Sequence, residues 1–404
     1  MSQKVRLGII GTGRRARSLM RLWAAHPLCE IVALCDRSRP LVEQAASTLD
    51  KPGVRLYTSY EDLLREGGVD ALLITMPPDM QADVACEAME RGIHVATEVP
   101  AAYTIDQCWK LVRTVEKTGA KYQLCEQVRF WGFVQAWREM ARRGEFGKII
   151  FVEGEYLHFE AWDYWVDPKT GEVFRGSATP PPGRDVEPTW RNRTFRHPIF
   201  YLPHTLGPLL SILNDRVVRV SCMGTRPASY FVEGYPGRDL EVALMHTEKD
   251  VLMRVAVGFT SPHGPRPQTV NHWMQVMGTE ATVEWARAGW DKPKIWRRGD
   301  ADWQPMEWTV RIDDAPEFIR SSGHGGADGW PVEAFLRAVA EDGPVSMDVY
   351  QAVESAAPAI LAARSAELGG ELLEVPDFRA SAAAAGGDPA KTGEGETRAA
   401  AGGG

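Results

Sequence analysis

The sequence contains no long hydrophobic run, and none of its apolar stretches approaches the roughly 18 residues of a membrane-spanning helix. The opening residues MSQKVRLGIIGTG pass directly into a short strand-like run and lack the apolar region and small-residue cleavage site of a signal peptide. We therefore expect a cytoplasmic protein without a membrane partner.

Clustered positive charge is also missing. The formal net charge is -8, and no run of lysine and arginine reaches about five residues. Nucleic acids and anionic lipid surfaces attract proteins mainly through positive charge. The composition thus argues against a polyanion-binding protein and predicts no nucleic-acid partner.

Cysteine is scarce, and the six cysteines show neither a CxxC pair nor the spacing of a metal site. Most of them lie in apolar surroundings, which is typical of reduced thiols in the core of a cytosolic protein. We expect no bound metal. The six are Cys29, Cys35, Cys86, Cys108, Cys125 and Cys222.

The rest of the composition is that of an ordinary globular protein. Apolar residues make up 44% and charged residues 25% of the 404 residues. A single hydrophobic core usually stops growing at about 250 to 300 residues. We therefore expect two domains, 1–125 and 126–378, followed by an alanine- and glycine-rich tail, 379–404, that is predicted to be disordered.

Residues 1–125 alternate short apolar strands with amphipathic helices. Such alternation is typical of a parallel sheet covered by helices on both faces, the doubly wound α/β or Rossmann arrangement. The predicted strands are 5–10, 30–36, 55–58, 71–75, 94–98 and 122–125.

Residues 126–378 carry longer strands separated by hairpin turns, which predicts a C-terminal α+β domain with a large, mostly antiparallel sheet. Segment 159–200 is too long and irregular for a simple connection, and two interpretations stay open, a surface loop and a substrate lid. The predicted strands are 149–157, 217–224, 241–247, 251–259, 271–278, 282–286 and 372–375, and the predicted helices are 332–340 and 347–367.

One face of this antiparallel sheet is predicted to be exposed and to bear Trp273, Val276, Val283 and Trp285. A large apolar face is rarely left in water. We therefore expect a homo-oligomer, a dimer or a tetramer, that associates through this face.

The strongest motif lies between the first predicted strand and the helix that follows it. A strand, a glycine-rich turn, a helix and an acidic residue at the end of the next strand together form the fingerprint of a dinucleotide site. The second glycine lets a pyrophosphate approach the backbone, and the helix N-terminus supplies positive potential. The motif comprises Gly11, Thr12, Gly13, Arg14, Arg15 and Asp36.

Asp36 and its neighbour Arg37 bear on which dinucleotide binds. The Asp36 carboxylate is expected to accept hydrogen bonds from the ribose hydroxyls and to repel a 2′-phosphate, which favours NAD over NADP. Arg37 leaves this choice open, because its guanidinium could pair with that phosphate or stack on adenine.

Two further clusters follow predicted parallel strands, at the edge where open α/β sheets bind ligands. The first holds Thr75 and Pro77, and the second holds Glu98 and Pro100. Together with the fingerprint and the β-rich second domain, they resemble the Gfo/Idh/MocA oxidoreductase superfamily. The resemblance implies that both clusters line the NAD site.

Two departures from that superfamily point to a narrower branch. Gln81 stands where members often have histidine, and Val99 where they have the lysine that transfers protons. The run EVPAA at 98–102 is similar to that of glycoside hydrolase family 109, the NAD-dependent α-N-acetylgalactosaminidases. Other similar segments are 106–109, 116–119, 126–128, 201–208, 323–328, 347–350 and 375–378. The resemblance covers 4–378 and is weakest over 157–200.

The resemblance implies roles for four residues. Glu126 and Tyr201 would bind substrate, with Tyr201 also counted among the catalytic residues, while Tyr156 and His204 would transfer protons. Histidine titrates closest to neutrality, and a spacing of three would place Tyr201 and His204 on one face of a helix. The alternative for His204 is a histidine buried in the core.

Four other residues are candidates for substrate binding. His158 lies two residues beyond Tyr156 on the same strand face. His324 lies in a glycine-flanked turn, which could instead be a flexible entry to the last helices. Trp190 and Arg191 belong to the long segment, and the C–H faces of sugars stack on aromatic rings.

Three functions compete. The first is a glycosidase that oxidises a sugar hydroxyl with bound NAD, so that the glycosidic oxygen leaves by elimination before water adds and the hydride returns. Such an enzyme needs no pair of catalytic carboxylates. The second is a net dehydrogenase or epimerase of a sugar, inositol or polyol, and the third is a non-catalytic NAD-binding protein.

Overall fold

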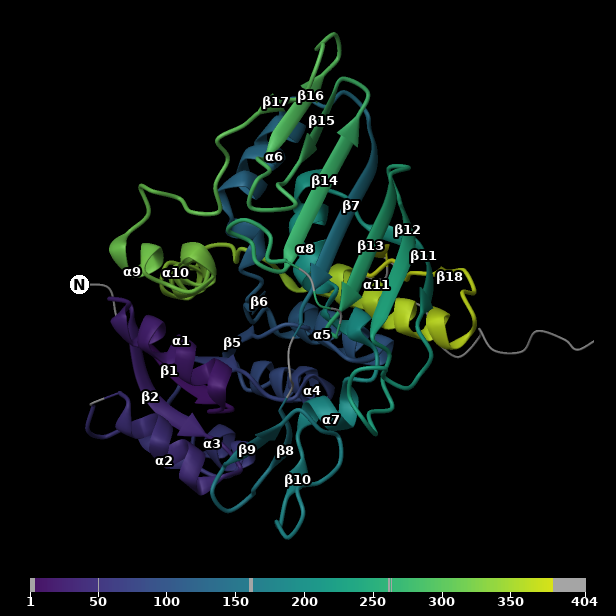
Figure 1. The fold of residues 1–404 in the computed structure, drawn as a ribbon. Helices are drawn as coiled ribbons and strands as arrows, with labels where there is room; N and C mark the ends of the chain where they lie inside the picture. The colour runs from purple at the N-terminus through teal and green to yellow at the C-terminus, as the bar shows by residue number, and fades with distance from the viewer. Residues whose placement is uncertain (1–3, 50, 160–162, 261, 263, 381–404) are drawn as a thin grey trace, which may run out of the picture.

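The computed structural model describes residues 4–49, 51–159, 163–260, 262 and 264–380 (Figure 1). The tail predicted to be disordered begins at 379, so most of it, 381–404, lies outside the described residues. Arg379 itself pairs with Glu354, Nε to Oε1, at 2.6 Å. Among the described residues, no helix is long and apolar enough to cross a membrane.

The N-terminal part is built on a six-stranded sheet. All neighbouring strands run parallel, in the order β3-β2-β1-β4-β5-β6, which confirms the predicted doubly wound fold. The strand order reverses between β1 and β4, the place where such sheets bind dinucleotides. The strands are β1 (Val5–Ile10), β2 (Cys29–Cys35), β3 (Arg55–Tyr57), β4 (Ala71–Ile74), β5 (His94–Thr97) and β6 (Tyr122–Leu124).

Helices cover both faces of this sheet. Successive residues of β4 alternate between two hydrophobic clusters, with Ala71 and Leu73 in one and Leu72 and Ile74 in the other, as the period of two requires. The helices that follow the strands are α1 (Arg14–Ala25), α2 (Arg39–Ser47), α3 (Tyr60–Glu66), α4 (Pro78–Met89) and α5 (Ile105–Thr118).

A helix from the far end of the chain completes this cover. The ring of Phe335 in α10 (Gly329–Ala340) lies 5.9 Å from that of Trp23 in α1, edge to face. Both residues belong to the same hydrophobic cluster. Residues far beyond 125 therefore stabilise the core of the first sheet.

The C-terminal part is built on a nine-stranded sheet in the order β17-β16-β15-β14-β7-β13-β12-β11-β18. Every neighbouring pair is antiparallel except β7 and β13, so the predicted sheet is confirmed. Helices α6 (Gly132–Arg142), α8 (Pro203–Leu213) and α11 (Val349–Glu367) pack behind it (Figure 1). The strands are β7 (Ile149–Leu157), β11 (Val217–Gly224), β12 (Leu240–Thr247), β13 (Leu252–Gly258), β14 (His272–Gly278), β15 (Ala281–Glu284), β16 (Lys294–Arg297), β17 (Gln304–Pro305) and β18 (Leu373–Glu374).

Segment 159–200 forms regular structure of its own. Strand β8 (Asp163–Val166) pairs with both β9 (Val173–Arg175) and β10 (Glu187–Pro188). Helix α7 (Trp190–Thr194) and a 3-10 turn, η2 (Pro198–Tyr201), follow. The segment therefore contains more regular structure than the sequence indicated, because these strands are too short to show a period. The two interpretations, a surface loop and a substrate lid, both stay predictions.

The apolar residues predicted on an exposed sheet face are buried instead. Val276, Val283 and Trp285 have no exposed surface, and the ring of Phe133 in α6 stacks on Trp285 with centroids 4.1 Å apart. Trp273 is covered by the guanidinium of Arg287, whose central carbon lies 3.4 Å from the centre of the Trp273 ring. For Val276, Val283 and Trp285 the prediction was wrong because α6, which the sequence pattern did not indicate, covers their face of the sheet. Trp273 lies on the opposite face, paired across the strands with Glu155.

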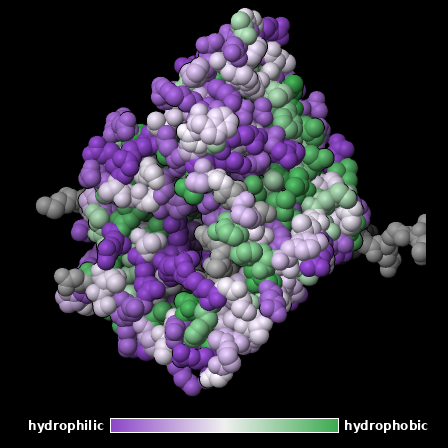
Figure 2. Space-filling model, in the orientation of Figure 1, coloured by the Kyte–Doolittle hydropathy of each residue, from purple (hydrophilic) through white to green (hydrophobic). Residues whose placement is uncertain are grey.

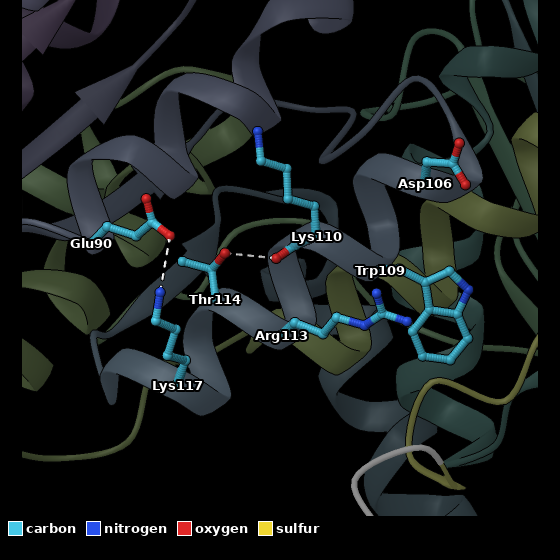
Figure 3. A pocket seen from close by; sticks show the side chains of 7 residues that line it. All are labelled: Glu90, Asp106, Trp109, Lys110, Arg113, Thr114 and Lys117. Carbon is cyan, nitrogen blue, oxygen red and sulfur yellow. Dashed lines mark hydrogen bonds and ion pairs between the residues drawn. The ribbon is translucent and has the colours of Figure 1, made fainter. Parts of the chain in front are cut away.

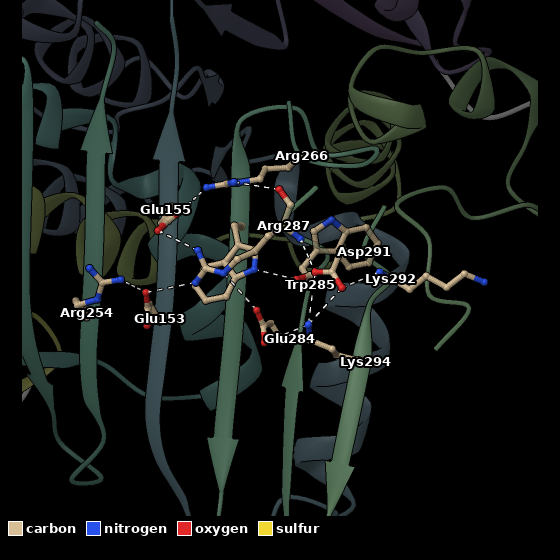
Figure 4. A network of polar contacts seen from close by, with 11 residues as sticks. Glu153, Glu155, Arg254, Arg266, Glu284, Trp285, Arg287, Asp291, Lys292 and Lys294 are labelled. Carbon is tan, nitrogen blue, oxygen red and sulfur yellow. Dashed lines mark hydrogen bonds and ion pairs between the residues drawn. The ribbon is translucent and has the colours of Figure 1, made fainter. Parts of the chain in front are cut away.

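The opposite sheet face combines charged and apolar side chains. Glu155 pairs with Arg266 at 2.6 Å and with Arg287 at 3.5 Å, within a larger network (Figure 4). On the same face, Leu244 of β12 is 51% and Leu252 of β13 is 47% exposed. Figure 2 shows hydrophobic surface on the side of the molecule where these strands lie. An apolar patch thus exists, built from residues other than those predicted.

Candidate functional site

The carboxyl edge of the parallel sheet gathers the predicted cofactor residues. Gly11 follows β1, Asp36 follows β2, Thr75 follows β4 and Glu98 follows β5. Gly11 has a φ of +87°, and a side chain there would lie 2.7 Å from the carbonyl oxygen of Thr75. This turn therefore requires glycine.

The turn before α1 fits a dinucleotide phosphate. Gly13 is the N-cap of α1, and a Cβ built there would meet no atom within 4 Å, which leaves open space beside the first helical amides. The amide of Thr12 donates to Oδ2 of Asp36 at 2.8 Å, and the amide of Ser38 donates to Oδ1 at 3.0 Å. Asp36 thereby fixes the turn, and Arg14 stands exposed at the start of the helix.

Arg15 joins the predicted cofactor edge to the His324 turn. Its Nε donates to Oε1 of Glu98 at 3.0 Å, and its Nη2 donates to Oδ1 of Asp328 at 3.1 Å. Oδ1 of Asp328 also lies 3.0 Å from Nδ1 of His324. Burial acts to raise the pKa of Asp328, but His324 and Arg15 outweigh it and hold that pKa far below its usual range. Asp328 stays ionised and links the two segments.

The turn after β5 is held by a residue that departs from the superfamily pattern. Nε2 of Gln81 donates to the carbonyl oxygens of Glu98 at 2.5 Å and of Pro100 at 2.9 Å. A primary amide offers two N–H donors, whereas a neutral imidazole offers one. Gln81 is thus matched to these two acceptors, and Pro77, the N-cap of α4, lies at the same edge of the sheet.

A second cluster lies where β6 leads into the C-terminal part. Glu126 is fully buried, and its Oε2 lies 2.6 Å from Nδ1 of His204, while its Oε1 accepts from the amide of Val128 at 2.8 Å. His204 is 8% exposed. Because Nδ1 faces the carboxylate, Nε2 is the nitrogen left to exchange a proton with a ligand. A carboxylate beside an imidazole stabilises the imidazolium that forms when histidine acts as a base.

Close packing of α8 brings this pair together. A side chain at Gly207 would lie 2.7 Å from Cγ of Glu126, and one at Gly154 of β7 would lie 2.3 Å from Cγ2 of Thr205. Both glycines therefore let α8 approach its neighbours more closely than any larger residue would.

Two of the predicted residues contact His204, and a third lies beside one of them. The ring of Tyr201 stacks on that of His204 with centroids 5.8 Å apart, and the ring of Tyr156 lies 5.4 Å from His204. His158 lies 4.6 Å from Tyr156, and its Nδ1 lies 3.1 Å from Nδ2 of Asn271. Tyr201 ends η2 while His204 belongs to α8, so the two rings meet without sharing one helix.

His272 completes the cluster, and the sequence analysis missed it. It stands opposite Tyr156 in the pairing of β14 with β7, and its ring stacks on Tyr156 at 4.3 Å and lies 6.3 Å from His204. The residue is 5% exposed, and its Nδ1 has no hydrogen-bond partner among the described residues. Burial, together with the nearby His204, His158 and His324, lowers the pKa of His272 well below 6.5. This imidazole is neutral and able to bind a hydroxyl.

Trp190 and Arg191 lie farther out, on α7. The ring of Trp190 lies 5.9 Å from that of Phe195, which in turn lies 4.5 Å from the ring of Tyr201. The guanidinium of Arg191 lies 5.0 Å from the Trp190 ring centre. Phe195 thus contacts both Trp190 and Tyr201, and Arg191 lies against the Trp190 ring.

Two cavities lie away from this cluster. One, of about 400 Å³, is lined by side chains of α5 and by Glu90, and its charged groups point in different directions (Figure 3). The other, a groove of about 1470 Å³, is lined in part by α6, α8 and α11. Neither is lined by Tyr156, Tyr201 or His204, so neither replaces the cluster as the candidate site.

Solved structures resemble this fold over most of its length. An oxidoreductase from Agrobacterium radiobacter in complex with NAD+, L-tartaric acid and magnesium has a TM-score of 0.71 and 16% identity, covering 94% of this chain and all of its own. Scyllo-inositol dehydrogenase from Lactobacillus casei with bound NAD(H) and scyllo-inositol has a TM-score of 0.68 and 14% identity, covering 92% and 99%. At these identities the likeness concerns the fold alone.

Sequence comparison is more specific. Three relatives, each described as a glycosyl hydrolase family 109 protein, match 93% of this chain. They come from Shewanella pealeana (26% identity, 85% of its length), Bacteroides thetaiotaomicron (27%, 85%) and Streptomyces niveus (28%, 77%).

Family models match both parts of the chain. Residues 5–125 match the oxidoreductase family with an NAD-binding Rossmann fold, and residues 134–384 match the C-terminal domain of glycosyl hydrolase 109. The second match alone spans more than half of the 404 residues. The chain therefore belongs to glycosyl hydrolase family 109, with the Rossmann domain of the Gfo/Idh/MocA oxidoreductases.

Proposed function

We propose that this protein is an NAD-dependent enzyme that cleaves a glycosidic bond in a small carbohydrate by oxidising a sugar hydroxyl transiently. The observation that carries the proposal is the buried pair of His204 and Glu126, 2.6 Å apart and surrounded by Tyr156, Tyr201 and His272. The NAD-binding family of residues 5–125 and the family 109 relatives support it.

The residues of the first sheet edge would hold the cofactor. The turn at Gly11 to Gly13 would receive the pyrophosphate, Asp36 the ribose, and the Thr75 and Glu98 turns the nicotinamide end. Bound NAD would supply an oxidant that accepts hydride from a sugar carbon and later returns it.

His204 is the base of the proposed reaction. Oxidation of a hydroxyl to a carbonyl would send its hydride to the cofactor and its proton to solvent. The neighbouring C–H is then acidic, and Nε2 of His204 removes its proton while Glu126 stabilises the imidazolium. The electron pair left on carbon forms a double bond and expels the glycosidic oxygen, which takes a proton from Tyr156 or the imidazolium. Water then adds to that double bond, the carbon regains a proton, and return of the hydride restores the hydroxyl. The net reaction is hydrolysis.

The remaining residues of the cluster would orient the sugar. The neutral imidazole of His272 has hydrogen-bonding capacity for a hydroxyl, and Tyr201 offers a ring to a C–H face. Trp190, Arg191, His158 and His324 stay predictions as substrate contacts, with His158 alone among them in ring contact with Tyr156.

Direct displacement by a carboxylate fits this geometry less well. Glu126 is fully buried, with one oxygen facing His204 and the other accepting from the Val128 amide. A retaining glycosidase must instead present a nucleophilic carboxylate to the sugar, about 5 to 5.5 Å from a second carboxyl group. The occupied carboxylate favours the redox route.

A panel of aryl glycosides tests this function. The proposal expects release of the aglycone without accumulation of NADH, and loss of that release in His204→Ala. The competing function, net oxidation or epimerisation of a free sugar or polyol, would use the same His204. It is supported instead if no glycoside releases aglycone while free sugars or polyols yield NADH.

We further propose a cytoplasmic homo-oligomer. All six cysteines are free and buried, as expected in a reducing compartment. The exposed Leu244 and Leu252 offer an apolar patch for association. A monomer in light scattering at micromolar concentration would contradict the assembly.

A further inference from the structure

The small sheet of segment 159–200 contacts the first domain just beyond β2. Nη2 of Arg37 lies 2.8 Å from Oε2 of Glu187 in β10. A side chain at Gly171, in the turn between β8 and β9, would lie 2.8 Å from Cδ2 of Leu41 in α2. Two separate contacts thus hold this sheet against the segment that follows Asp36 (Figure 1).

Arg37 is the residue that a 2′-phosphate would need. An arginine near the end of the second strand accommodates that phosphate in NADP sites, and a guanidinium can bind it through two N–H groups. Here Arg37 is turned toward Glu187, while the Asp36 carboxylate accepts from the amides of Thr12 and Ser38. Arg37, the cation beside the expected ribose position, is therefore paired with one carboxylate, and it follows a second, Asp36, in the sequence.

We infer that Glu187 selects NAD over NADP. A 2′-phosphate approaching Arg37 would have to displace Glu187 or lie beside two negative charges, and either would weaken the binding of NADP. The 2′-hydroxyl of NAD carries no charge, so Glu187 changes the affinity for NAD little. The side chains of Arg37 and Glu187 are 70% and 46% exposed, so their ion pair adds little to folding stability. Its effect would instead be on the charge that a bound nucleotide meets. The inference rests on the proposed NAD site and adds a residue from outside the fingerprint.

The size of the effect follows from Coulomb's law. Two unit charges about 4 Å apart in water change a dissociation constant by about fivefold, and salt reduces the effect at longer range. Removing the Glu187 charge should therefore improve NADPH binding by about fivefold and leave NADH binding nearly unchanged.

A competition experiment with the full chain tests this. Each protein is equilibrated by dialysis with equal concentrations of NADH and NADPH, then denatured, and the released nucleotides are quantified by chromatography. Glu187→Gln should raise the ratio of bound NADPH to NADH about fivefold. The matched control is Asp185→Asn, two residues away, whose carboxylate pairs with Lys169 at 3.0 Å instead. This control should keep the wild-type ratio.

The double variant Glu187→Gln/Arg37→Ala shows whether the effect of Glu187 on NADPH binding requires Arg37. If Glu187 acts through Arg37, removing the guanidinium abolishes the gain in NADPH binding. A ratio in Glu187→Gln equal to that of the wild type overturns the inference while the NAD site stands, whereas a gain that survives in the double variant assigns the selection to direct repulsion between Glu187 and the phosphate. Binding of neither nucleotide to the wild type would overturn the proposed function and this inference with it.

Discussion

Nδ1 of His204 and Oε2 of Glu126 lie 2.6 Å apart, and the carboxylate is completely buried. A buried charge is stable only when a partner compensates it. The pair belongs to different elements, since Glu126 follows β6 and His204 lies in α8. Chemistry at this site therefore depends on how α8 packs.

Removing the charge of Glu126 should slow turnover and spare cofactor binding. Glu126→Gln keeps the size of the side chain but no longer stabilises an imidazolium at His204, so we expect kcat to fall by about 10- to 100-fold. His204→Ala and Tyr156→Phe should each cost at least about 100-fold. Steady-state kinetics and NADH binding by fluorescence measure the two properties. Full activity in both His204→Ala and Tyr156→Phe would show that the site is assigned wrongly.

The approach of α8 to β7 can be tested at Gly154. In Gly154→Ala the new methyl group would meet Cγ2 of Thr205, so we expect a loss of about 1 to 3 kcal/mol in stability and reduced activity. Thr205→Ser removes that carbon, and the double variant should recover much of the loss. Unfolding by urea measures each variant. An equal loss in the single and double variants would mean that this contact does not set the position of α8.

His272 makes stability depend on pH. The folded protein holds the pKa of His272 below 6.5, whereas an unfolded chain takes up the proton at about 6.5. Below that pH the unfolded state binds the additional proton, so stability falls as the pH is lowered, by up to about 1.4 kcal/mol per unit. Urea midpoints between pH 5 and 7 should therefore change less steeply in His272→Gln. Parallel curves for the two proteins would contradict a buried neutral imidazole.

Asp36→Ala should weaken NAD binding about ten- to hundredfold, because one charged hydrogen bond contributes about 1.5 to 3 kcal/mol. Discrimination against NADP should relax in the same variant. The carboxylate also accepts from Thr12 and Ser38, so a small loss of thermal stability should accompany the change. Unchanged affinities for both nucleotides would refute the role of Asp36 at the ribose.

The sequence predicted those features that depend on local pattern. The parallel strands, the glycine turn and the larger antiparallel strands each have a signal within a few neighbouring residues and are confirmed. The position of His204 in a short motif also marked it as a candidate site residue, and the structure places it beside Glu126 and Tyr201.

Other features depend on contacts between distant segments. His272 begins a predicted strand, but only the register of β14 on β7 shows that it faces Tyr156. Trp285 looks like an exposed strand residue until α6 is placed over it. Glu187 stands in a two-residue strand without any local signal, and only its distance to Arg37 suggested the role that we propose for it.

Solvent deuterium incorporation tests the central claim most directly. If a sugar hydroxyl is oxidised transiently and the adjacent C–H is broken before the glycosidic oxygen leaves, turnover in D2O must place deuterium on that carbon of the released sugar. The NADH signal should return to its starting level at the same time. Mass spectrometry and proton NMR of the product measure the label. Aglycone release with that carbon fully protonated would contradict the redox route and leave direct displacement.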